Sequence, residues 1–162
     1  MGKLLRVVAA LSLGVSASFA ADEMATTHVV FTTEAIQWGD APPVLPAGAK
    51  MAVLKGDPAE EGIFTARLLM PAGYKIMPHW HPASENVTVM SGTAWLGTGS
   101  TFDKTRAQKL PPGSYTSIPP RHQHFAWAET ECVIQLTAMG PWQLYYINPD
   151  DDPQAVARSA RK

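Results

Sequence analysis

Two histidines and a glutamate lie close together in the middle of the chain and could bind a metal ion. His79 and His81 are separated by one residue, and Glu85 follows four positions later. In an extended strand, residues i and i+2 face the same side, so both imidazoles would point one way and Trp80 the other. A short bend could return the carboxylate to that side. Imidazole nitrogens with a carboxylate oxygen favour a divalent transition metal ion, whereas the histidine pair alone would also suit a solvated surface strand.

A second pair of histidines favours the metal interpretation. Four of the five histidines occur in two close pairs, the second being His122 and His124, and only His28 stands alone. His122 and His124 have the same strand parity, so either could complete the site, and the other could lie behind the ligands or at the surface. His28 is interpreted as a surface residue.

The first twenty residues have the features of a secretory signal peptide. Lys3 and Arg6 precede an apolar run from Val7 to Val15, and Ser18–Ala20 supplies small residues before a cleavage site at Ala21. A membrane anchor is disfavoured because the apolar run is shorter than the roughly 20 residues needed to span a bilayer. We therefore expect a periplasmic or secreted protein that does not associate with the membrane after cleavage.

Charge and cysteine content limit the partners of the mature protein. Without Lys3 and Arg6, 11 basic residues remain against 14 acidic ones, a net charge of −3. Nucleic acid is therefore not an expected partner. Cys132 is the only cysteine, so no internal disulfide can form, and its apolar neighbours predict a buried thiol.

The mature chain is predicted to be all-β and to form one domain. Short apolar or alternating segments recur between glycine and proline turns, which is typical of a sandwich or small barrel. Residues 21–50 form an irregular lead-in with an N-terminal strand, residues 51–148 the barrel, and residues 149–162 a flexible tail. Thr101–Ala107 could form a helical turn. The predicted strands are Met51–Leu54, Ile63–Met70, Asn86–Met90, Thr93–Leu96, Tyr115–Ile118, Phe125–Ala128, Cys132–Met139 and Trp142–Ile147.

These segments resemble the paired motifs of the cupin superfamily, of the RmlC-like type. The first motif, G-x5-H-x-H-x3-E-x6-G, is complete, and the second, G-x5-P-x-G-x2-H-x3-N, is matched in part. Arg121 replaces the glycine of the second motif and Ala128 its asparagine, so the turn before the last histidine could differ from the usual one. The matching residues are Gly73, His79, His81, Glu85 and Gly92, followed by Gly113, Pro119 and His124.

The resemblance implies a double-stranded β-helix, or jelly-roll barrel, that holds one divalent metal ion. Its ligands would be His79, His81, Glu85 and His124. Manganese, iron or nickel would fit the resemblance, and zinc or copper would also suit an exported protein. Glu85 and His122 are candidate catalytic residues, as is Tyr115, because tyrosines near the metal act as acids or bases in some cupins; an aromatic at the barrel rim is the alternative for Tyr115. Many cupins are dimers, so a homodimer is expected.

Two functions follow from this metal pocket. The first is a metal-dependent enzyme of the dioxygenase, lyase or isomerase type, acting on a small oxygenated organic molecule. The alternative is a non-catalytic cupin that binds or senses a small molecule in the same pocket. A purely structural metal is disfavoured, because closed structural zinc sites usually contain cysteine and this ligand set leaves coordination positions open.

Overall fold

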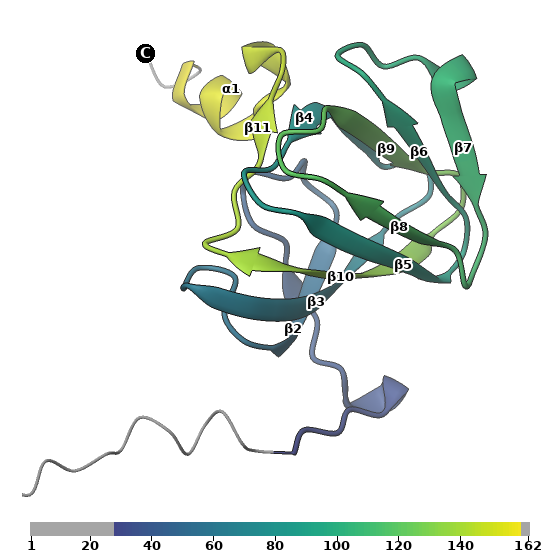
Figure 1. Ribbon diagram of the computed structural model, residues 1–162, viewed down its shortest axis with the longest axis vertical. Helices are drawn as coiled ribbons and strands as arrows, with labels where there is room; N and C mark the ends of the chain where they lie inside the picture. Colours follow the sequence, from purple (N-terminus) through teal and green to yellow (C-terminus); the bar gives the residue numbers. More distant parts are fainter. Residues whose placement is uncertain (1–27, 160–162) are drawn as a thin grey trace, which may run out of the picture. The chain divides into compact units, whose positions relative to one another are not determined.

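The fold is built almost entirely of antiparallel β-strands (Figure 1). The computed structural model describes residues 28–159, so the predicted signal peptide lies outside the described residues. The helical segments are the 3-10 turns η1 (Thr33–Ala35), η2 (Lys104–Arg106) and η3 (Pro149–Asp151) and the short helix α1 (Pro153–Ser159). Within residues 28–159, no helix has the length and apolar character needed to cross a membrane.

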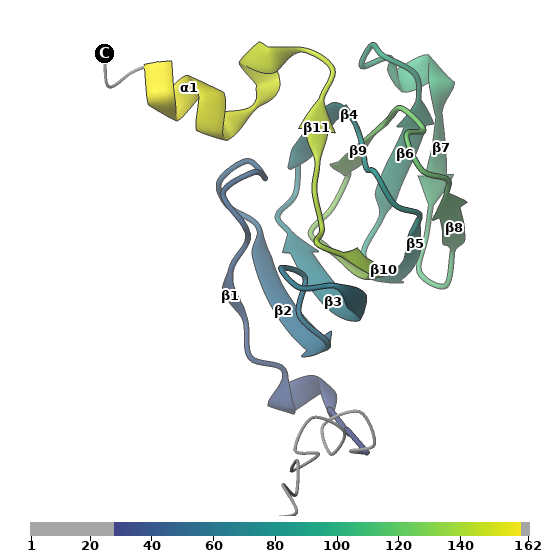
Figure 2. The same ribbon diagram turned by 60° about the vertical axis from the view of Figure 1, so that its left-hand side comes forward.

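The strands form two sheets, which Figure 2 shows from a second side. One sheet has six strands in the order β1 (Gly39–Asp40), β2 (Lys50–Lys55), β3 (Gly62–Met70), β10 (Cys132–Gly140), β5 (Glu85–Ser91) and β8 (Tyr115–Ile118). The other has five strands in the order β11 (Tyr145–Tyr146), β4 (Lys75–Trp80), β9 (His124–Ala128), β6 (Ala94–Thr98) and β7 (Ala107–Leu110). Long-range crossovers between the sheets place strands from distant parts of the sequence side by side.

The core lies between the two sheets. In β3, Phe64, Ala66 and Leu68 are buried and alternate with partly exposed residues, as expected for a strand with one face inward. They belong to one apolar cluster that also includes Ile76 of β4. Cys132 is fully buried, and burial raises the pKa of its thiol to about 11. The prediction of an all-β barrel with a buried thiol is confirmed.

Some segments are more ordered or shorter than predicted. Leu45 and Ala49 of the lead-in are buried in the core, and the Tyr74 hydroxyl donates to the Pro46 carbonyl at 2.6 Å. The segment predicted as a flexible tail contains η3 and α1. The strand predicted over Trp142–Ile147 comprises only the two residues of β11. β7 lies outside the predicted strands, whereas β1 lies in the lead-in, for which a strand was predicted, and β4 contains His79, which was predicted to be extended. The helical turn predicted over Thr101–Ala107 is confirmed by η2.

Two turns bring the motif segments together. Gly92 connects β5 to β6 with a φ of +71°, and a Cβ atom there would lie only 2.0 Å from the Glu131 carbonyl oxygen, so the turn requires glycine. Arg121 replaces the second-motif glycine and adopts a φ of +61°, the left-handed conformation. Its N–H donates to the His81 carbonyl at 2.7 Å, which supports this conformation. The chain therefore reaches β9 through a left-handed turn even with arginine.

Candidate metal centre

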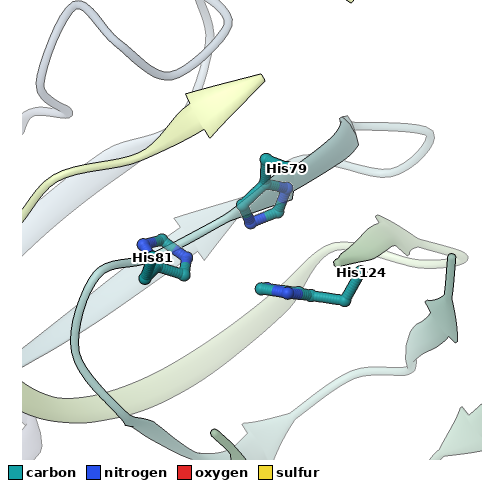
Figure 3. Close-up of side chains that lie close together, drawn as sticks. All are labelled: His79, His81 and His124. Atoms are coloured by element: carbon teal, nitrogen blue, oxygen red, sulfur yellow. The ribbon is translucent and has the colours of Figure 1, made fainter. Parts of the chain in front are cut away.

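Three histidines converge on one buried point (Figure 3). His79 lies in β4, His81 directly follows that strand, and His124 begins β9. The antiparallel register of β4 and β9 places His79 directly opposite His124. One ligand atom from each ring lies within 4.8 Å of the others. Trp80 faces the other way and stacks on Tyr145 at 4.5 Å between ring centroids, as the alternation of the strand predicts.

Backbone carbonyls fix the orientation of all three rings. The Nδ1 atoms of His79, His81 and His124 lie 2.7, 2.7 and 2.9 Å from the carbonyl oxygens of Met77, Gln143 and His122. Because a carbonyl can only accept a hydrogen bond, each neutral ring carries its proton on Nδ1. The lone pair of each Nε2 is then free for a ligand. Ligating histidines in metalloproteins are oriented in this way.

Burial keeps two of the three imidazoles uncharged. Loss of hydration, followed by the charges of His124 and His81, holds the pKa of His79 well below its ordinary value of 6.5. Burial likewise lowers the pKa of His124 to about 4. Both rings are therefore neutral near pH 7, which is the protonation state that a metal ion requires.

Glu85 lies beside the three histidines. It begins β5, and only 6% of its surface is exposed. Its Oε2 is 3.6 Å from Nε2 of His81, and its Oε1 accepts a hydrogen bond from the indole of Trp142 at 3.3 Å. The indole also stacks on the His81 ring, with 5.4 Å between the centroids. Glu85 is outside the group of three ligand atoms that lie within 4.8 Å of one another, so its role as a ligand stays a prediction.

The two other candidate catalytic residues are exposed. Tyr115 is 62% exposed, and its hydroxyl donates to Asn86 at 2.8 Å. Strand alternation turns Tyr115 outward while Ile118 faces the core, and its role as an acid or base stays a prediction. His122 is also exposed. Its carbonyl orients His124, and its charge helps to lower the pKa of that ring.

The sequence pattern did not predict the contribution of Trp142 to the site. The residue lies between strands β10 and β11 and contacts both His81 and Glu85. No spacing rule connects it to the histidine motif. The contacts of the Met77 and Gln143 carbonyls with the histidine rings were also not predicted, because the residue type does not show which group a backbone carbonyl will bind.

A small cavity adjoins the histidines. Its volume is about 50 Å³, and its lining includes His79, His124, Glu85 and Ala126. Eleven of the fifteen lining residues are apolar, so the chamber has few groups that could orient a polar ligand. Ala126 lies on the same face of β9 as His124, and its small side chain leaves this space open.

The donor set fits a divalent transition metal ion. Three imidazole nitrogens point at one site, and a carboxylate lies within reach of it. The three buried histidines could therefore bind one such ion. Three or four protein donors leave open coordination positions for water or another small ligand. Such an ion could polarise an oxygen atom or activate bound water.

Comparisons with known proteins identify the family. Residues 20–144 match the family model described as a domain of unknown function, DUF4437. The chain belongs to the DUF4437 family. No curated protein matches this DUF4437 chain. The two antiparallel sheets and the solved structures that resemble it show the predicted jelly-roll fold of cupins, and its motifs resemble those of the cupin superfamily.

Several solved structures are similar to this DUF4437 chain over most of its length. The polyketide cyclase RemF from Streptomyces resistomycificus has a TM-score of 0.65 and 14% identity, covering 82% of this chain and 94% of its own. A putative acetylacetone dioxygenase from Methylibium petroleiphilum has a TM-score of 0.60 and 18% identity, covering 78% and 85%. KdgF from Halomonas sp. has a TM-score of 0.53 and 19% identity, covering 70% and 94%. At these identities the similarity establishes the fold alone.

Proposed function

We propose that this protein is a metal-dependent enzyme of the dioxygenase, lyase or isomerase type that acts on a small oxygenated organic molecule. The observation that carries the proposal is the convergence of three buried histidines beside a cavity. A metal ion that only stabilised the fold would not need an adjoining chamber or open coordination positions. Polyketide cyclase and dioxygenase activities named among the similar structures are compatible with this proposal.

The roles of the protein groups follow from their positions. His79, His81 and His124 would hold the ion through Nε2, and their carbonyl partners would keep the rings from turning. Glu85 would serve as a fourth ligand or hold a proton near the substrate, because its carboxylate is buried and close to His81. Manganese, iron or nickel are the proposed ions, with zinc and copper as alternatives.

Elemental analysis of the purified protein tests the metal site. The wild-type protein should contain about one transition metal ion per chain, and the His79→Ala/His81→Ala double variant should contain almost none. A His28→Ala variant is the control, because this histidine is exposed. Unchanged metal content in the double variant would refute the metal site.

A turnover screen separates the enzyme from its alternative, a non-catalytic protein that binds or senses a small molecule. The metal-loaded protein would be tested against phenolics, keto acids, sulfonium compounds and uronates. Turnover that Glu85→Gln abolishes while the metal stays bound would support the enzyme. Saturable binding without product would support the alternative.

We further propose that the mature protein is periplasmic or secreted and forms a homodimer. The proposal of export depends on the charged and apolar pattern of residues 1–20. Cell fractionation and mass determination of the mature N-terminus test it, and an uncleaved cytoplasmic chain would refute it. Sedimentation analysis tests the dimer.

A further inference from the structure

The cavity beside the histidines limits which molecules the site can accept. An apolar cavity of roughly 150 Å³ holds one benzene molecule. This cavity, at about 50 Å³, is smaller, so it suits a group of roughly three to five heavy atoms. A sugar ring or an aromatic ring would not fit inside it without rearrangement of the core.

The lining offers no partner for a negatively charged group. It contains no lysine or arginine, and Glu85 is its only charged residue. The other polar residues are Thr116 and the ligand histidines His79 and His124. A carboxylate or phosphate inside the chamber would lose its hydration without gaining a cation, which strongly disfavours binding. The chamber favours uncharged groups.

Polar residues of the neighbouring strands cannot supply the missing cation, because they lie on the opposite face of the sheet. Arg67 of β3 donates through Nε to the side-chain oxygen of Gln135 in β10 at 3.1 Å. The hydroxyls of Thr65 and Thr137 form the next pair along these strands, at 2.9 Å. None of the four lines the cavity. Arg121 lies over the outward-facing Trp80 ring.

We propose that the cavity receives a short, uncharged alkyl group of about three to five heavy atoms, while an oxygen donor of the same molecule binds at the histidines. The position of the oxygen donor in this inference rests on the proposed function. The size and polarity of the chamber are properties of the protein alone. The substrate class is then a small neutral carbonyl or hydroxyl compound with an alkyl tail, rather than a sugar acid or a dicarboxylate.

A series of hydroxamates tests the proposal in the cobalt(II)-loaded protein. Each hydroxamate chelates the metal with the same group, and the visible spectrum of cobalt reports binding. Affinity should increase from acetohydroxamate to butyrohydroxamate and decrease for octanohydroxamate. Succinomonohydroxamate, whose tail ends in a carboxylate, should bind about tenfold more weakly than butyrohydroxamate, or worse. Equal or tighter binding of the charged compound, or no dependence on the tail, would overturn the proposal.

Xenon provides a test that does not depend on metal. The metal-free protein should bind xenon, detected by xenon NMR, because xenon occupies small apolar cavities. Ala126→Leu should fill the chamber and abolish the signal, whereas Ser117→Leu on the exposed face of β8 should leave it unchanged. If Ala126→Leu fails to fold, Ile134→Ala serves instead, because it enlarges the chamber and should shift the preference toward longer tails.

The two tests separate this inference from the proposed function. If the protein binds xenon but takes up no metal, the inference of an apolar cavity stands and the proposed metal-dependent enzyme is refuted. If the protein binds metal and shows turnover, but binds no xenon and does not discriminate between hydroxamate tails, the proposed enzyme stands and the alkyl pocket is refuted.

Discussion

The metal-free protein should lose stability as the pH falls from 7 to 5, mainly because of its buried histidines. Burial lowers the pKa of His124 from 6.5 to about 4 in the folded state, while the unfolded chain should have the ordinary value. The unfolded state therefore binds more protons than the folded state across this window. The stability contributed by the neutral ring is fully present above pH 6.5 and is progressively lost as the pH falls toward about 4.

The magnitude follows from the two pKa values. One pKa unit corresponds to about 1.4 kcal/mol, so at pH 5 the unfolding free energy should be lower by about 2 kcal/mol from His124 alone. Below pH 4 the loss approaches about 3 kcal/mol. The pKa of His79 is shifted in the same direction and adds to this loss. The exposed carboxylates whose pKa values are lowered, such as Asp40, contribute mainly at lower pH.

Urea unfolding of the chelator-treated protein at pH 7 and pH 5 provides the measurement. In His124→Gln the amide cannot titrate, so the stability difference between the two pH values should shrink by about 2 kcal/mol. His122→Gln is the matched control, because His122 is exposed and its replacement should leave most of the difference in place. An equal pH dependence in wild type and His124→Gln would refute the assignment of a buried neutral imidazole.

Four further substitutions test separate parts of the site and its turns. His124→Ala should abolish tight metal binding in calorimetry while His122→Ala retains it, and the reverse result would exchange their roles. Trp142→Phe keeps an aromatic ring on the histidine face but removes the donor to Glu85, so metal affinity should fall roughly tenfold; an unchanged affinity would contradict this. Gly92→Ala should lower the unfolding free energy by about 2 kcal/mol or more in urea unfolding, because of the positive φ and the close carbonyl; a neutral effect would contradict the turn geometry.

Local spacing was sufficient to predict which side chains gather and from which strands. The i, i+2 spacing of His79 and His81 places them on one face, and the second motif predicts His124 about forty positions later. The sequence also contained a signal for the outward orientation of Tyr115. Ile118 is three positions away, so an inward isoleucine requires an outward tyrosine.

Other features depend on tertiary contacts that no residue pattern encodes. Trp142 reaches Glu85 only because the segment after β10 returns past β4, and the two residues are 57 positions apart. The left-handed turn at Arg121 is supported by a hydrogen bond to the His81 carbonyl, which overrides the general preference for glycine. The cavity depends on how the apolar side chains of both sheets fill the barrel, and composition does not determine packing.

The contrast between the ligands and Glu85 indicates how the site could perform chemistry. Backbone carbonyls hold each histidine ring, so these three donors have little freedom to turn. Among residues 28–159, the Glu85 carboxylate accepts a side-chain hydrogen bond from Trp142 alone, at 3.3 Å, and lies 3.6 Å from Nε2 of His81, so a rotation could move it toward the histidines or away. Three fixed donors and one movable carboxylate suit a site that binds an ion constantly but transfers a proton in only part of its cycle. If Glu85→Gln loses the metal together with activity, the carboxylate is a ligand instead, and proton transfer must be assigned to another group.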